Sequence, residues 1–149
     1  LKRTVGGPVP GFDEVFPMER TDDQLPHADV VALVLPHSPS TVRFMDRRRL
    51  ELLKDDAVLL SAGRGTVLDQ DALVELMQGG KLWGAALDVT EPEPLPADSP
   101  LWEVPRLLIT PHVAGGMRLE VTRKNCVQLA LDNLRRYQNG EPLQNLVAR

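Results

Sequence analysis

The sequence predicts an α/β fold built on a parallel sheet, and three observations support that prediction. Short apolar runs recur along the chain, helical patterns alternate with them, and proline or small residues end most of the runs. The expected strands are residues 30–35, 57–60, 82–89 and 106–110. Since parallel strands in one sheet need crossover connections, the intervening helices indicate right-handed βαβ units. We therefore expect part of a doubly wound parallel sheet, followed by a long C-terminal helix.

The first of these strands has the clearest signal. Residues 30–35 are a continuous apolar run that ends at Pro36, which is typical of a strand buried on both faces. Residues 90–105 hold five prolines, a density that predicts an ordered surface loop without a helix or an inner strand. The segment 11–16 is a candidate for one more short strand.

Helical spacing of apolar residues predicts three helices. They are expected at 46–54, from Asp69 to the Gly79-Gly80 pair, and at 117–138. The last helix carries one apolar stripe, which we expect to pack in a core. The stripe consists of Val127, Leu131, Leu134 and Tyr137.

Composition narrows the class of protein. The 149 residues are enough for one modest domain, and 42% hydrophobic with 26% charged residues is ordinary for a globular protein. The net charge of −4, from 17 basic and 21 acidic residues, argues against nucleic acid or an acidic membrane as the main partner. No run is long enough for a membrane span. Cys126 is the only cysteine, so no internal disulfide can form, and we expect a protein of the reducing cytoplasm. We expect the Cys126 side chain to be buried, as a small apolar group.

Four polar residues follow strands of the predicted sheet, namely Arg64, Asp88, Glu93 and His112. Ligands of open parallel sheets bind outside the carboxyl ends of the strands, so all four are expected at one rim. Each has an ordinary explanation when taken alone: a turn arginine, a surface glutamate or a helix-capping histidine. A shared rim favours a site, because a site needs an acid or base, its orienting group and an anion-binding group together.

The other two histidines suit catalysis less well. His27 precedes the first strand and is expected at its amino end, on the opposite edge of the sheet. His37 follows the same strand on the predicted rim, beside Pro36. We interpret His37 as a residue that lines a cofactor groove or is exposed.

Four ordered blocks of this sequence resemble the NAD(P)-binding domain of the D-isomer-specific 2-hydroxyacid dehydrogenases, and glyoxylate/hydroxypyruvate reductases in particular. The blocks are Leu35 to Thr41, Ser61 to Asp69, Ala86 to Pro96 and Thr110 to Gly116. The resemblance implies a Rossmann-like fold and hydride transfer between NAD(P)H and a small 2-keto or 2-hydroxy acid. It also implies a homodimer in the complete protein.

The resemblance assigns a role to each catalytic candidate, and the chemistry agrees. His112 would be the acid and base, because imidazole titrates near ~6.5 and can exchange a proton at neutral pH. Glu93 would orient the imidazole, and Arg64 would clamp the substrate carboxylate through its planar guanidinium. Asp88 would hold the nicotinamide carboxamide. The full set expected to contact the cofactor is Arg3, Pro36, Ala62, Gly63, Arg64, Asp88, His112, Ala114 and Gly115, and no metal site is expected.

The sequence departs from the family at its beginning. The glycine-rich turn G-x-G-x-x-G after the first strand is absent, so we expect a partial dinucleotide-binding domain at 1–116. Residues 117–149 would form a return helix and tail that pack on a missing substrate domain. The cations of Lys2-Arg3 stand where such folds usually place an acidic residue, which favours NADP slightly over NAD.

Two other functions stay open from the sequence. Some relatives of this kind act as corepressors, so a dinucleotide-sensing interaction module is one alternative. The retained Arg64, Glu93 and His112 favour the enzyme, since a sensor has less need of all three. The other alternative is an inactive fragment of the enzyme, because half of the cofactor site would be missing.

Overall fold

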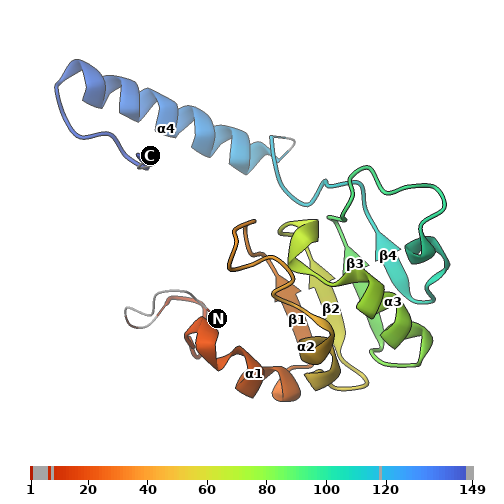
Figure 1. The fold of residues 1–149 in the computed structure, drawn as a ribbon. Coiled ribbons are helices and arrows are strands. Elements are labelled where there is room, and N and C mark those ends of the chain that lie inside the picture. The colour runs from red at the N-terminus through yellow and green to blue at the C-terminus, as the bar shows by residue number, and fades with distance from the viewer. Residues whose placement is uncertain (2–6, 8, 118, 147–149) are drawn as a thin grey trace. The chain divides into compact units, whose positions relative to one another are not determined.

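The computed structural model describes residues 1, 7, 9–117 and 119–146, and the chain divides into two units, Leu1–Pro111 and His112–Arg149 (Figure 1). The predicted α/β class is confirmed in the first unit, which is built on a four-stranded sheet. The strands follow the order β1-β2-β3-β4, and every neighbouring pair is parallel.

All four predicted strands are found, and the second extends one residue beyond its predicted end. They are β1 (Val30–Leu33), β2 (Val58–Ser61), β3 (Gly84–Leu87) and β4 (Leu107–Ile109). In the register, Leu33 pairs with Ser61, Ser61 with Leu87, and Leu87 with Ile109. The last residues of the strands therefore stand in one row, and the loops that follow them leave the sheet from a common rim.

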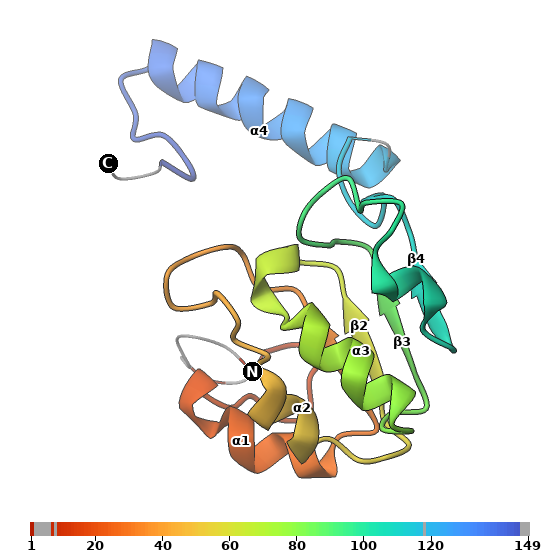
Figure 2. The same cartoon turned by 45° about the vertical axis from the view of Figure 1, so that its right-hand side comes forward.

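Two helices cover one face of this sheet, α2 (Arg47–Leu52) and α3 (Gln70–Gln78) (Figures 1 and 2). Both begin at an aspartate whose carboxylate accepts a hydrogen bond from a backbone N–H of the first turn: Asp46 from Arg49 and Asp69 from Ala72. Leucines and a methionine of the helices pack on strand residues in one hydrophobic core. That core includes Leu50, Leu53, Leu73 and Met77 from the helical layer, with Leu33, Leu59 and Leu87 from the strands.

The opposite face of the sheet carries exposed apolar side chains, so the prediction that the strand at 30–35 is buried on both faces is wrong. Val30 of β1 is 58% exposed and Leu108 of β4 is 62% exposed, while their alternating neighbours face the core. Periodicity could not reveal this difference, because an apolar run does not show which element covers each of its faces.

The short elements differ most from the prediction. The predicted strand at 11–16 is not formed, and three short consecutive helices follow at 18–27. These are η1 (Met18–Arg20), α1 (Thr21–Gln24) and η2 (Leu25–His27). The proline-rich loop contains the 3-10 helix η4 (Pro100–Glu103), which was not expected; it begins with Pro100 at a position that needs no N–H donor.

The second unit contains α4 (Glu120–Gln138), the segment that leads into it and a tail that turns back beside it. The predicted burial of the stripe is wrong within this unit, where Val127, Leu131, Leu134 and Tyr137 are all exposed. Cys126 is also exposed, which corrects the prediction of a buried thiol. Among the described helices, none has the length and apolar character needed to cross a membrane.

The end of α4 follows from its sequence. Gly140 adopts a φ of 68°, and the N–H of Glu141 donates to the Arg136 carbonyl at 2.8 Å, a Schellman arrangement. The tail is then held by Asn133, whose amide donates to the Gln144 carbonyl (3.1 Å) and accepts from the Gln144 N–H (2.8 Å). The second unit is therefore a helix with its own return segment.

Candidate functional site

The backbone on either side of Arg64 is packed so closely that only glycine fits there. A β carbon on Gly63 would lie 2.4 Å from the Leu35 carbonyl oxygen, and one on Gly65 would lie 2.0 Å from the Thr90 carbonyl oxygen. Leu35 follows β1 and Thr90 follows β3. The loop after β2 is thus held between its two neighbours, and this contact fixes Arg64 at the rim.

The guanidinium of Arg64 has little to bind inside the protein. Its Nη1 donates to the carbonyl of the neighbouring Gly63 at 2.7 Å, and the side chain is exposed. Within the part of the chain that the structure describes, Arg64 forms no ion pair. An arginine that no carboxylate neutralises, at the carboxyl end of a parallel sheet, is suited to bind an anionic ligand.

Glu93 lies in the loop after β3, on a turn that its own side chain helps to form. The Oε1 of Glu93 accepts a hydrogen bond from the Thr90 N–H at 3.0 Å. The Thr90 hydroxyl donates to the Pro92 carbonyl at 3.0 Å. These two bonds order the turn that presents Glu93.

Arg64 and Glu93 line one cleft of about 440 Å³. This volume falls in the usual range of small-molecule sites. One wall comes from the loops after β1 and β2, and the other from the loop after β3. The lining residues are His37, Arg64, Gly65, Thr66, Thr90, Glu91, Pro92 and Glu93.

His37 is the residue of this cleft to which sequence reasoning gave no catalytic role. It is exposed, and its Nδ1 lies 2.9 Å from the Thr66 hydroxyl. Its position after β1 placed it on the predicted rim, and this was the sequence feature that could have marked it as a site residue. The contact with Thr66, 29 residues later, could not be read from the sequence.

Asp88 follows β3 directly, at the same rim, and is only 8% exposed. Its carboxylate accepts a hydrogen bond from the Thr110 hydroxyl, and its N–H donates to the Ser61 carbonyl at 2.8 Å. The chain leaving β4 thus passes beside Asp88 before it reaches residue 112. A buried carboxylate at a strand end is a candidate for binding a polar ligand group.

The remaining predicted site residues lie in three places. Pro36 and Ala62 are exposed at the rim, and the Pro36 carbonyl accepts from the Thr41 hydroxyl at 2.6 Å. His112, with a φ of 52°, opens the second unit, which also holds Ala114 and Gly115. Arg3 lies outside the described residues.

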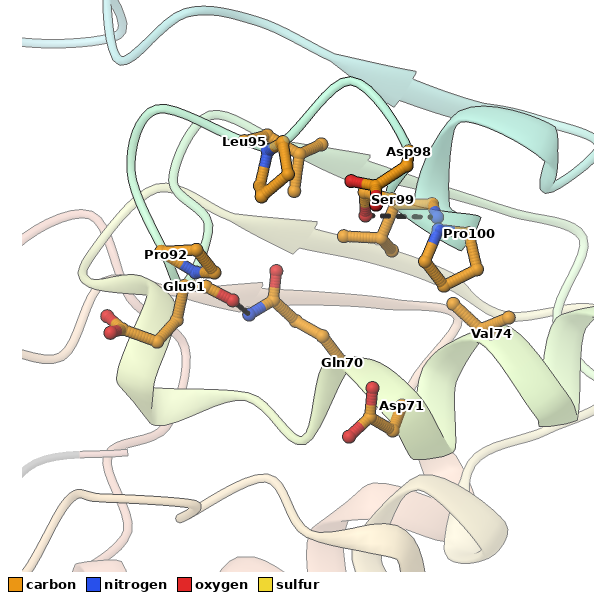
Figure 3. Close-up of a pocket in the computed structure, with 11 residues that line it drawn as sticks. Gln70, Asp71, Val74, Glu91, Pro92, Leu95, Asp98, Ser99 and Pro100 are labelled. Atoms are coloured by element: carbon orange, nitrogen blue, oxygen red, sulfur yellow. Dashed lines mark hydrogen bonds between the residues drawn. The ribbon is translucent and has the colours of Figure 1, made fainter.

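A second pocket, of about 300 Å³, lies behind the loop that carries Glu93 (Figure 3). Gln70, at the start of α3, donates from Nε2 to the Glu91 carbonyl at 3.0 Å. Glu91 and Pro92 line both this pocket and the cleft. The bond from Gln70 therefore ties α3 to the wall of the candidate site.

In the described residues, no group of three or more His, Cys, Asp or Glu side chains is arranged to hold a metal ion.

Comparison with known proteins identifies the family. The family model described as "D-isomer specific 2-hydroxyacid dehydrogenase, NAD binding domain" matches residues 10–114. The chain belongs to the D-isomer specific 2-hydroxyacid dehydrogenase family. The match includes the three loops that form the cleft and also reaches His112.

Individual relatives agree with this assignment. The chain is 40% identical over 138 residues to a protein of Corynebacterium melassecola described as "Uncharacterized protein in proB 3'region", covering 93% of this chain and 45% of that protein. It is 40% identical over 123 residues to glyoxylate/hydroxypyruvate reductase B of an Enterobacter species, covering 83% of this chain and 37% of the relative.

A solved structure supports the fold as well. The D-isomer specific 2-hydroxyacid dehydrogenase of Xanthobacter autotrophicus, in complex with NADPH and MES, superposes with a TM-score of 0.79 at 34% identity. The alignment covers 89% of this chain and 53% of that one. This chain thus spans about half the length of the relatives that it matches, or less.

Proposed function

We propose that this chain forms the cofactor-side part of an oxidoreductase that transfers hydride between NAD(P)H and a small 2-keto or 2-hydroxy acid, such as glyoxylate or hydroxypyruvate. One observation carries the proposal: Arg64 stands without an ion pair among the described residues, in the same cleft as Glu93. A small carboxylate fits that guanidinium. The name of the Enterobacter relative supports the choice of substrate.

The chain's own groups divide the work in this proposal. Arg64 binds the substrate carboxylate and polarises the carbonyl through two parallel N–H donors. His112 donates a proton to the carbonyl oxygen on reduction and accepts it on oxidation. Glu93 orients the imidazole and favours its protonated form. The hydrogen bond from the Thr90 N–H, which orders the turn around Glu93, supports this role.

The described residues fit the nicotinamide end of a dinucleotide. Asp88 offers a nearly buried carboxylate for an amide group, and Pro36, Ala62 and Gly63 offer backbone at the same rim. Ala114 and Gly115 are proposed to complete this surface from the second unit. When bound, the nicotinamide would supply the hydride. The NADPH complex of the Xanthobacter relative supports NADP as the first cofactor to test, with NAD beside it.

The proposal includes an organisation into two parts. Residues 1–116 would form the cofactor-binding part, and residues 117–149 a return helix and tail that pack on a substrate domain. The exposed stripe of α4 supports this division, because an apolar helix face is stable when another element covers it. A homodimer and a cytoplasmic location are part of the same proposal.

The decisive experiment follows oxidation of NADH and NADPH by absorbance with glyoxylate, hydroxypyruvate and pyruvate. We expect turnover in the wild type, and a loss of kcat/KM of about 100-fold or more in Arg64→Gln, since the group that binds the developing charge is removed. Arg106→Gln is the matched control. Arg106 is also exposed and without an ion pair in the described residues, but it precedes β4, at the amino end of the sheet.

The outcomes separate the alternatives. Equal losses in the two arginine variants would contradict the proposal. Binding of NADH or NADPH without turnover of any of the three acids would favour a dinucleotide-sensing module.

A further inference from the structure

The wall of the cleft beside Arg64 carries a hydrogen-bonding pair that the proposed mechanism does not use. The pair is the imidazole of His37 and the hydroxyl of Thr66, joined at 2.9 Å between Nδ1 and Oγ1. Both residues line the cleft with Arg64. The pair connects the loop after β1 to the 3-10 helix η3 (Gly65–Val67) after β2.

Backbone bonds hold both members of the pair in place. The Thr66 carbonyl accepts from the Arg43 N–H at 2.8 Å, and Gly65 before it packs on Thr90. On the other side, the Thr41 hydroxyl donates to the Pro36 carbonyl at 2.6 Å, immediately before His37. The imidazole is therefore oriented before any ligand arrives, which lowers the entropic cost of binding.

The pair keeps hydrogen-bonding capacity for a ligand. The Nδ1 of His37 is used by Thr66, while its Nε2 has no partner within the described residues. On the facing wall, by contrast, the Thr90 hydroxyl is already bound to the Pro92 carbonyl. Apart from the charged groups, the hydrogen-bonding atom of these two walls that is still available to a ligand is thus the Nε2 of His37.

The charges of the cleft limit what this capacity can bind. Arg64 provides one cation for one carboxylate, whereas Glu91 places a carboxylate on the facing wall. A second carboxylate on the ligand would meet this like charge. A neutral hydroxyl would meet no such repulsion, and it can donate to or accept from the imidazole.

We propose that His37 and Thr66 form a substrate-contacting pair that selects 2-keto acids with a hydroxyl group on the third carbon, while Arg64 holds their carboxylate. This inference rests on the proposed function and adds the residues that select the substrate. Hydroxypyruvate carries such a hydroxyl, and pyruvate differs from it only by lacking one. A site that hydrogen-bonds a hydroxyl discriminates against the analogue that lacks it, because its polar groups are then left unpaired.

The test uses the chain's three histidines as reporters in NMR spectra. Imidazole resonances of the wild type are followed during titration with hydroxypyruvate and, separately, with pyruvate. We expect hydroxypyruvate to bind more tightly by about fivefold to tenfold, the ratio that one net hydrogen bond supports. We also expect it to shift the His37 resonance and leave that of His27 in place.

Two variants sharpen the result. His37→Leu and Thr66→Val should remove the preference for hydroxypyruvate over pyruvate, since each loses the hydroxyl contact. His27→Leu, at the amino end of β1, is the matched control and should keep the preference. The same preference should appear in KM when turnover is measured with NADPH or NADH.

The failures are distinguishable. Equal affinity for the two acids, with both weakened by Arg64→Gln, would overturn the role of His37 and Thr66 and leave the proposed function standing. Binding that is indifferent to Arg64→Gln would overturn both.

Discussion

The arginines of the helical layer and the arginine of the rim have opposite surroundings. Arg48 and Arg49 both contact the carboxylate of Asp22 at 2.7 Å, and the guanidinium of Arg49 lies 4.1 Å from the centre of the Phe44 ring. Among the described residues, the Arg64 side chain forms one hydrogen bond, to the carbonyl of its neighbour Gly63, and no ion pair. Arg48 and Arg49 form contacts within the chain, whereas the charge of Arg64 is available to a ligand.

This difference separates arginines that stabilise the fold from an arginine that can bind a ligand. Hydrogen bonds from Arg48 and then Arg49 hold the pKa of the Asp22 carboxyl below its usual value. That charge is already neutralised, so it offers little to a ligand. Arg64 has a glycine on each side, and among the described residues it forms no ion pair, so the backbone contacts of these glycines are what position the cation.

The largest effect on this difference between the arginines is expected when Arg64 is displaced but keeps its charge. In Gly65→Ala, the new β carbon would stand 2.0 Å from the Thr90 carbonyl oxygen, so the loop must shift. We expect the free energy of unfolding to fall by about 3 kcal/mol from overpacking. Binding of oxamate, an unreactive analogue of the substrate, should weaken by about 100-fold because the cation is displaced.

Denaturant unfolding and calorimetric titration measure these two effects. Gly79→Ala, whose β carbon would meet nothing closer than 3.3 Å, is the matched control and should cost less than about 1 kcal/mol. If Gly65→Ala behaved like Gly79→Ala in both measurements, the glycine contacts would not be what positions Arg64.

A smaller effect is expected when the charge stays in place but its shape changes. Arg64→Lys replaces the planar two-pronged donor with a single ammonium group, so oxamate binding should weaken by about tenfold. Unfolding should be unchanged, since Arg64 has no ion pair to lose among the described residues. Full retention of oxamate affinity would show that a point charge is enough and that no two-pronged contact exists.

The paired arginines should show the reverse behaviour. Asp22→Asn should lower the free energy of unfolding by about 1 kcal/mol or less, because the carboxylate is partly exposed, and should leave oxamate binding unchanged. Since the folded pKa of Asp22 is lowered, its contribution is present above the unfolded value of about 3.9 and is lost as the pH falls through the folded value.

The difference in stability between the wild type and Asp22→Asn should therefore be constant near neutral pH and shrink below about pH 4. Urea unfolding at a series of pH values tests this. Asp23→Asn, which breaks only the exposed pair with Arg20, controls for the change in net charge. A difference that grew as the pH fell would contradict the lowered pKa.

The smallest effect belongs to an exposed pair. Arg47 contacts both Glu75 and Glu51 on the surface of the two helices. Arg47→Gln should change the free energy of unfolding by less than about 0.5 kcal/mol, because solvent screens such pairs. Thermal unfolding at low and high salt measures the effect. If Arg47→Gln lost as much stability as Asp22→Asn, solvent exposure would not explain the difference between the Arg47 pairs and the Asp22 pairs.

The sequence predicted the sheet well because its strands are short apolar runs with breakers at their ends. Val30–Leu33 and Leu107–Ile109 both lie inside the predicted ranges. The sequence could not predict the short helices at 18–27, which lack the length that a helical period needs. It also placed Cys126 and the stripe of α4 in a core, because periodicity identifies an apolar face without its partner.

The candidate site was partly predictable for a similar reason. The rule that loops leave a parallel sheet at its carboxyl end was enough to place Arg64, Asp88 and Glu93 at one rim. The assignment of their catalytic roles, and that of His112, came from the family resemblance and stays a prediction. The pairing of His37 with Thr66 depends on loop geometry, which no spacing in the sequence encodes.

The tail of the second unit has a consequence for how this protein would move. Asn133 holds the Gln144 backbone by both its donor and its acceptor, and Arg136 donates to the Pro142 carbonyl at 3.1 Å, so residues 142–144 are joined to α4 at two points. A rotation of the chain before α4 would then carry these residues together with the helix. Replacing Asn133 alone would leave the contact with Arg136 in place.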